Sequence, residues 1–213
     1  MPITVFVADD HAIVREGLAS LLGGQADIHV IGTAADGRDA VRQIVKLEPE
    51  VVVMDIAMPN MNGIEAAREI RDRVPQVQVI ILSMHSSAEH VFHALEAGAQ
   101  GYLLKESAAK EIIDAVRSVR AGHRYLSKKI GEVMADHIGR TSAASPLGSL
   151  SARERQVLQL VAEGRSSAQI AAALHLSPKS VDTYRSRLMQ KLHIGDVAGL
   201  VKFAIQHGLT SLD

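Results

Sequence analysis

The chain has 213 residues, 47% of them hydrophobic, and a formal net charge of −1, so its length permits one large domain or two modest ones with apolar cores. It contains no cysteine, which excludes disulfides and thiolate metal sites and is consistent with a reducing cytoplasm. The chain does not start with a basic stretch followed by an apolar segment, and no apolar run approaches the ~18 residues of a transmembrane helix, so we expect a cytoplasmic protein without membrane contact.

The first 122 residues alternate between short apolar runs and longer amphipathic stretches. The apolar runs predict strands near residues 3–8, 28–34, 51–55, 79–84 and 101–105. The amphipathic stretches predict helices near residues 12–22, 37–47, 63–74, 88–97 and 108–121. This alternation predicts an α/β domain over residues 1–122, with a doubly wound, five-stranded parallel sheet between two layers of helices.

The alternation stops after Gly122. A polar amphipathic segment near 128–138 precedes a stretch of small residues with Pro and Gly over 141–149. Such a composition is typical of a connection between domains. We therefore expect residues 123–149 to form a linker that contains one helical segment.

Residues 150–213 have the pattern of a small all-α domain. Ser151 and Glu154 have the spacing of a capping box, which predicts the start of a first helix that ends at Gly164. Ser177 and Pro178 predict the start of a third helix. The four expected helices lie near 151–164, 167–175, 178–192 and 197–207.

The charge is distributed unequally between the two predicted domains. Residues 1–145 contain 15 Lys and Arg against 19 Asp and Glu, whereas residues 146–213 contain 8 against 5. The acidic part suits cation binding, and the mildly basic part suits an anionic polymer.

Three carboxylates follow two of the predicted strands. Asp9 and Asp10 come directly after the first apolar run, and Asp55 closes the third. The carboxyl ends of parallel strands open into the ligand crevice of an α/β sheet, so these acids should gather there. They would repel one another without a divalent cation, and Mg²⁺ suits a site of few carboxylates with room for water and phosphate.

A hydroxyl and an ammonium group follow two further strands. Ser83 comes after the run at 79–82, and Lys105 comes after the run at 101–104. Acids, a hydroxyl and a lysine at successive strand ends indicate a site that handles phosphoryl groups, because such sites work mainly by positioning groups and neutralising oxygen charge.

These residues resemble the receiver domain of two-component response regulators, which has a flavodoxin-like fold. The resemblance implies that Asp55 accepts a phosphoryl group from the phosphohistidine of a sensor histidine kinase. It also implies that Asp9, Asp10, Asp55 and the backbone carbonyl of Ala57 hold Mg²⁺. Lys105 and Ser83 would contact the phosphoryl oxygens, and Ser83 and Tyr102 would form the switch, with Tyr102 turning inward after Ser83 moves.

The last segment resembles the helix-turn-helix domain of the NarL/FixJ class of regulators, also called LuxR-type. The matching stretches are Ser151–Leu158, Val161–Gly164, Ile170–Ser177 and Val181–Leu192. The resemblance implies that the third helix binds double-stranded promoter DNA. Its expected DNA-contacting residues are Lys179, Ser180, Asp182, Thr183, Arg185, Ser186, Arg187 and Lys191.

Helical geometry divides the side chains of that helix between two faces. At 100° per residue, an apolar face suited to packing contains Val181, Tyr184, Leu188 and Leu192. The polar residues Thr183 and Ser186 lie opposite, where a helix in the major groove contacts base edges. The basic residues are suited to phosphates, whereas Asp182, where many relatives have a basic residue, can accept a hydrogen bond from cytosine.

The sequence therefore predicts a regulator rather than an enzyme, which binds DNA, dimerises when phosphorylated, and catalyses only its own phosphorylation and dephosphorylation. One alternative is a Mg²⁺-dependent aspartyl phosphohydrolase, but such enzymes of the haloacid dehalogenase type need a second acid where this chain has Ala57. Another is a DNA-binding regulator that does not depend on phosphorylation.

Overall fold

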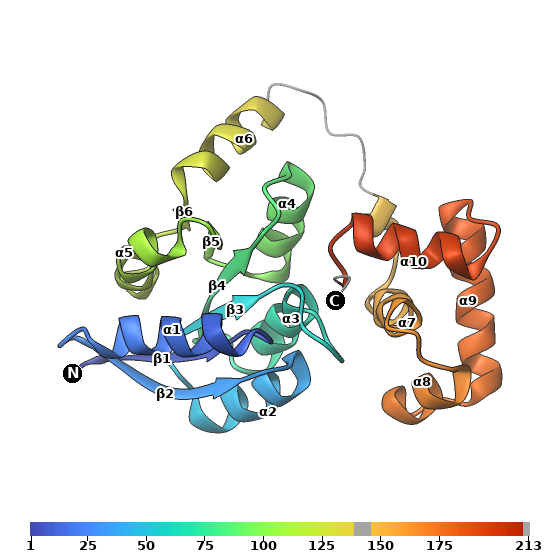
Figure 1. Ribbon diagram of the computed structural model, residues 1–213, viewed down its shortest axis with the longest axis horizontal. Coiled ribbons are helices and arrows are strands. Elements are labelled where there is room, and N and C mark those ends of the chain that lie inside the picture. Colours follow the sequence, from blue (N-terminus) through green and yellow to red (C-terminus); the bar gives the residue numbers. More distant parts are fainter. Residues whose placement is uncertain (139–145, 211–213) are drawn as a thin grey trace. The chain divides into compact units, whose positions relative to one another are not determined.

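The computed structural model describes residues 1–138 and 146–210. The chain forms two compact units, Met1–Ser142 and Ala143–Asp213 (Figure 1). The first unit continues beyond residue 122, where the sequence predicts the start of a linker. Residues 139–145 of that predicted linker lie outside the described part of the chain.

The first unit is built on one parallel sheet with the strand order β2-β1-β3-β4-β5-β6. Its strands are β1 (Ile3–Ala8), β2 (Ile28–Ala34), β3 (Val51–Asp55), β4 (Gln78–Ser83), β5 (Gly101–Leu104) and β6 (Tyr125–Leu126). The doubly wound α/β fold is confirmed, but the sheet has six strands rather than five. The two residues of β6 are too few to show an alternating pattern, and they form a strand because β5 offers an open edge.

The helices lie on both faces of the sheet. They are α1 (Ala12–Gly23), α2 (Gly37–Leu47), α3 (Gly63–Arg73), α4 (Ala88–Ala97), α5 (Ala108–Arg120) and α6 (Lys128–Ile138). Helices α1 and α5 cover one face, and α2, α3 and α4 contribute to the core on the other. In β1, Val5 and Val7 belong to the first of these cores and Phe6 to the second, which explains why the run is apolar at every position.

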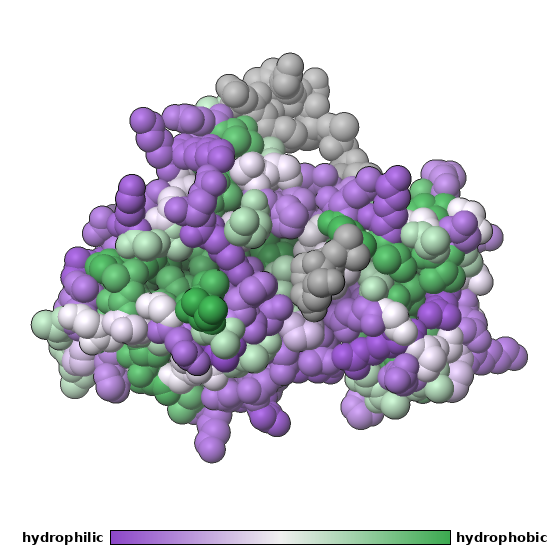
Figure 2. All heavy atoms as spheres, viewed as in Figure 1, coloured by the Kyte–Doolittle hydropathy of each residue, from purple (hydrophilic) through white to green (hydrophobic). Residues whose placement is uncertain are grey.

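The second unit is helical, with a 3₁₀ turn η1 (Pro146–Ser149) followed by α7 (Ala152–Ala162), α8 (Ser167–Leu174), α9 (Pro178–Leu192) and α10 (Val197–Gln206). The capping box is confirmed, because Ser151 accepts from the Glu154 amide and the Glu154 carboxylate accepts from the Ser151 amide. Ser177 caps α9 through the Ser180 amide. In both units hydrophilic side chains cover much of the visible face, with apolar ones between them (Figure 2).

Two glycines differ in how much room their surroundings leave for a side chain. Gly63 begins α3, and a Cβ there would lie 2.0 Å from the carbonyl oxygen of Asp55, so backbone must shift. Gly17 lies exposed within α1, and its Cβ would meet nothing within 4 Å.

We expect Gly63→Ala to lower the free energy of unfolding by about 1–3 kcal/mol through overpacking. Gly17→Ala should raise it by about 0.5–1 kcal/mol, because alanine loses less backbone entropy in a helix. Chemical denaturation followed by circular dichroism measures both. Equal effects of the two substitutions would contradict the packing seen at Gly63.

Candidate functional site

The sheet brings the predicted acids together at the carboxyl ends of two neighbouring strands. Asp9 follows β1 and Asp55 ends β3, and these strands pair side by side. Asp9 and Asp55 are almost completely buried, with 0% and 3% of their surface exposed, and Asp10 is partly exposed. Ligand atoms of Asp9, Asp10, His11 and Asp55 all lie within 4.8 Å of one another.

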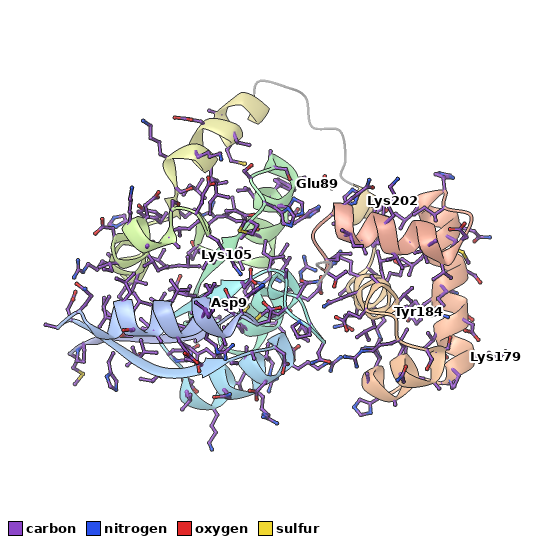
Figure 3. All side chains as sticks on the ribbon, in the orientation of Figure 1. Asp9, Glu89, Lys105, Lys179, Tyr184 and Lys202 are labelled. Carbon is purple, nitrogen blue, oxygen red and sulfur yellow. The ribbon has the colours of Figure 1, made fainter. Side chains whose placement is uncertain are left out.

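Lys105 lies between the two buried carboxylates. Its Nζ is 2.8 Å from Asp55 Oδ2 and 2.9 Å from Asp9 Oδ2. Its backbone amide donates to the Ser83 carbonyl, which ties the end of β5 to the end of β4. Figure 3 shows Asp9 and Lys105 in the same region of the first unit. The structure thus places side chains from the loop after β1, the end of β3 and the loop after β5 in one pocket.

Burial and neighbouring charges together set the ionisation of the pocket. Burial raises the pKa of Asp55, Lys105 lowers it and Asp9 raises it again, which leaves the pKa at about 6. Burial disfavours the charged form of Lys105, but the carboxylates of Asp55 and Asp9 outweigh this effect, so the pKa of Lys105 is raised. The ammonium group of Lys105 therefore stays charged. Its single positive charge cannot neutralise both carboxylates.

The donor set of the pocket fits an oxygen-seeking divalent cation. The ligands are carboxylate oxygens, and Asp9 Oδ2 is buried and accepts no hydrogen bond within the described residues, although it pairs with Lys105. Ala57 lies two residues beyond Asp55 and is partly exposed. The acidic cluster can therefore hold a metal ion.

His11 belongs to this cluster, although the sequence analysis gave it no role. Its Nδ1 lies 2.8 Å from Asp10 Oδ1 and 3.3 Å from Asp9 Oδ1, and its amide donates to Asp9 Oδ1. The only available signal was its position directly after the two acids. Side-chain direction after a strand end depends on the loop that follows, which residue order alone does not fix.

Ser83 and Tyr102 are linked through the backbone that follows β4. The buried Ser83 hydroxyl accepts from the His85 amide at 3.0 Å, and the Tyr102 hydroxyl donates to the His85 carbonyl at 2.8 Å. The Tyr102 side chain is fully buried. The inward turn predicted from the sequence is therefore not needed in this structure, where the ring is already inside and holds the segment after β4.

The face of α9 that points away from the other helices contains polar side chains. Lys179, Thr183, Ser186 and Arg187 are exposed, whereas Val181 and Leu188 are buried in the helical core. Figure 3 shows Lys179 on the outer side of α9 and Tyr184 on the side facing its neighbours. The Thr183 hydroxyl donates to the Lys179 carbonyl at 3.0 Å.

Three other residues expected to contact DNA make bonds within the unit. Ser167 Oγ donates to Asp182 at 2.7 Å and accepts from Arg185 at 3.1 Å, and Arg185 also donates to the Arg165 carbonyl. Ser180 bonds to Ser177 at the helix cap. These contacts fix the start of α9 against α8.

Lys191 is held by a buried acid. Its Nζ lies 2.8 Å from Glu154 Oε2, and Glu154 is only 4% exposed. Burial alone would raise the pKa of Glu154, but the bonds from Lys191 and Ser151 outweigh it and hold the pKa below its usual range. Lys191 therefore joins α9 to α7 in this structure.

We expect Asp55→Asn to stabilise the first unit in the absence of divalent cations. The pKa of about 6 in the folded chain exceeds the ~3.9 of an unfolded Asp, so the folded state of the parent chain binds more protons between these values. Its stability should fall as the pH rises from about 4 to 6, by on the order of 2 kcal/mol, and the variant should lack this loss.

Urea denaturation in EDTA at pH 4.5 and pH 8 measures the difference. Asp72→Asn, which changes an exposed carboxylate of α3, serves as the control and should leave the pH dependence unchanged. A variant at Asp55 that is less stable than the parent at pH 8 would contradict the electrostatics described for the pocket.

Comparison with known protein families assigns both units. Residues 5–117 match the family described as response regulator receiver domain. Residues 148–204 match the family described as bacterial regulatory proteins, luxR family.

Individual relatives match over nearly the whole chain. The response regulator UvrY of Escherichia coli K12 is 38% identical over 212 residues, which cover 99% of this chain and 97% of UvrY. The response regulator VraR of Staphylococcus aureus Mu3 is 35% identical, covering 98% and 99%. A structure of the Salmonella typhimurium response regulator RcsB, described in terms of DNA interaction, is 25% identical, with 95% and 97% coverage and a TM-score of 0.61.

Proposed function

This chain belongs to the NarL/LuxR family of response regulators, and from that membership we propose that phosphorylation of Asp55 controls DNA binding by α9. The family consists of DNA-binding transcription regulators, so the chain is a phosphorylation-controlled regulator and not a classical enzyme. The observation that supports Asp55 as the acceptor is its buried carboxylate, 2.8 Å from Lys105 and beside Asp9.

The proposed reaction transfers a phosphoryl group from a phosphohistidine of a sensor histidine kinase. An oxygen of the Asp55 carboxylate attacks phosphorus, the P–N bond breaks, and its electron pair returns to the imidazole, which takes a proton from solvent. The product is an acyl phosphate on Asp55. The receiver contributes only positioning and charge neutralisation, to this step and to the later hydrolysis of the acyl phosphate.

Each neighbouring group has a separate task. Lys105 already lies at hydrogen-bond distance from Asp55 and can follow the charge onto the phosphoryl oxygens. The Ser83 hydroxyl accepts from the His85 amide and can at the same time donate its own proton to a phosphoryl oxygen. Mg²⁺, held by Asp9, Asp10, Asp55 and the Ala57 carbonyl, would supply the remaining neutralisation of charge on the transferring group.

The proposed DNA interface is the exposed face of α9. Thr183 and Ser186 are placed to contact base edges, and Lys179 and Arg187 to contact phosphates. Asp182, Ser180, Arg185 and Lys191 act in this proposal mainly by positioning the helix, through the bonds described above. One short helix contacts few base pairs, so we infer that the phosphorylated chain binds paired half-sites as a homodimer.

The proposed location is the cytoplasm, where kinase and promoter DNA are both accessible. Within the described ranges, none of the helices combines the length and hydrophobicity that a membrane span requires.

Asp55→Ala should abolish labelling by a small acyl phosphate in the presence of Mg²⁺, because the nucleophilic oxygen is removed. Labelling is followed by intact mass, which increases by one phosphoryl group in the parent chain. Asp72→Ala removes an exposed carboxylate elsewhere and should be labelled like the parent. Labelling of the Asp55 variant would contradict the assignment of Asp55 as the acceptor. If the labelled parent binds DNA with unchanged affinity, this would instead favour a regulator that does not depend on phosphorylation.

Lys179→Ala should weaken binding to all DNA sequences alike and reduce the slope of log affinity against log salt by about 1, because one phosphate contact is lost. Thr183→Ala should instead alter the sequence preference at one position. Fluorescence anisotropy at several salt concentrations measures both. Lys202→Ala, in α10, is the charge-matched control, and an equal loss of salt dependence there would contradict α9 as the principal DNA-contacting helix.

A further inference from the structure

His11 adds a nitrogen atom to a cluster whose other ligand atoms are carboxylate oxygens. Its Nδ1 lies 2.8 Å from Asp10 Oδ1 and 3.3 Å from Asp9 Oδ1, and ligand atoms of all four residues of the cluster lie within 4.8 Å of one another. Two ligand atoms bound to one metal ion at ~2.1 Å are themselves about 3–3.4 Å apart, at right or tetrahedral angles. The spacing around His11 is therefore close to that of neighbouring ligands of a single ion.

Lys105 and His11 approach different oxygens of the buried Asp9. Lys105 pairs with Oδ2 of Asp9 and Oδ2 of Asp55, whereas His11 faces Asp9 Oδ1, to which its backbone amide also donates at 2.9 Å. Asp9 is 0% exposed, and its Oδ2 accepts no hydrogen bond within the described residues, although it pairs with Lys105. The ammonium group can therefore stay in place while the Oδ1 atoms and the imidazole bind a cation.

The charge of the cluster matches that of a dication. Three ionised aspartates and the Lys105 ammonium leave a net charge of −2 in the pocket. A neutral imidazole adds a lone pair to the donor set without changing this charge. A divalent ion therefore neutralises the pocket, which the lysine alone does not.

The donor set that includes His11 favours a different metal from the all-oxygen set expected to hold Mg²⁺. Mg²⁺ takes oxygen ligands in octahedral geometry and keeps several waters, so an imidazole nitrogen adds little to its binding. Zn²⁺ and related transition-metal ions bind imidazole and carboxylate together. The His11 side chain is 57% exposed, so it can turn toward an ion without disturbing a core.

We propose that His11 and the three aspartates of the cluster form a closed site for a dication of the Zn²⁺ class, which competes with Mg²⁺ and with phosphorylation. Four protein ligands complete a tetrahedral Zn²⁺ site. An ion held in this way takes an oxygen of Asp55 and leaves no open position for a phosphoryl oxygen. The metal affinity does not depend on the proposed function of Asp55, whereas the competition rests on it.

Metal titrations of the full chain test the role of His11. In isothermal titration calorimetry, His11→Ala should lose Zn²⁺ affinity by at least about tenfold, while its Mg²⁺ affinity stays within about twofold of the parent value. The His11 side chain makes no capping bond to α1, so the variant keeps the start of that helix. His29→Ala is the matched control, because His29 is exposed near the amino end of β2, and it should keep both affinities. Unchanged Zn²⁺ affinity in His11→Ala would overturn the proposal.

A second variant separates binding of the metal by His11 from positioning of Asp10. The side chain in His11→Asn can still hydrogen-bond to a carboxylate, but its amide nitrogen has no lone pair available to a metal. This variant should therefore lose Zn²⁺ affinity like His11→Ala. Parent-like Zn²⁺ affinity in His11→Asn, or equal losses for Zn²⁺ and Mg²⁺, would mean that His11 only orients Asp10 and would overturn the proposal.

Co²⁺, a spectroscopic substitute for Zn²⁺, reports the bound imidazole directly. Proton NMR of the Co²⁺-loaded parent should contain a hyperfine-shifted, solvent-exchangeable N–H resonance from the His11 ring nitrogen that does not bind the ion. This resonance should be absent from His11→Ala and present in His29→Ala. Its presence in His11→Ala would assign the metal to another histidine and contradict the site.

The competition with phosphorylation is measured separately. With Mg²⁺ in excess, Zn²⁺ should suppress labelling of the parent chain by a small acyl phosphate, and His11→Ala should need at least about tenfold more Zn²⁺ for the same suppression. Equal sensitivity to Zn²⁺ would overturn the competition. A parent chain that is not labelled in Mg²⁺ alone would contradict the proposed function, while the metal affinities and the N–H resonance would still decide the site.

Discussion

The first unit depends on burying two carboxylates, Asp9 and Asp55, around a single ammonium group. Parallel strands that are apolar on both faces bring these acids to one edge of the sheet, where Lys105 lies within 3 Å of both. Burial raises the pKa of Asp55, Lys105 lowers it, and the charge of Asp9 raises it again, because one positive charge does not neutralise two buried negative ones. A cation bound in the pocket would add positive charge beside the two carboxylates and so stabilise the folded unit.

Hydrogen bonds join residues beside this pocket to the chain segment that enters α6. Ser83 and Tyr102 both bond to His85, and Tyr102 also bonds to Ser127 at the start of α6. Packed cores change between discrete arrangements rather than deforming gradually, so residues that are bonded in this way move together.

In the second unit, basic residues near one another in sequence have different tasks. Arg185 and Lys191 bond to α8 and to Glu154, so they orient α9, whereas Lys179 and Arg187 extend from the exposed face. Phosphate contacts need mobile charges at the surface, and a helix that enters a groove needs a fixed orientation. A count of positive residues on α9 therefore overstates the number available to DNA.

The sequence by itself determined the features that arise from local pattern: the apolar strands, the order of acids at their ends, the Ser151 cap and the apolar side of α9. These follow from burial on both faces of a parallel sheet and from bonds between residues three or four apart. Only the tertiary structure decided that β6 joins the sheet, that Tyr102 is already buried, and that Lys191 pairs with Glu154. Each of these depends on a partner distant in sequence, which residue spacing does not specify.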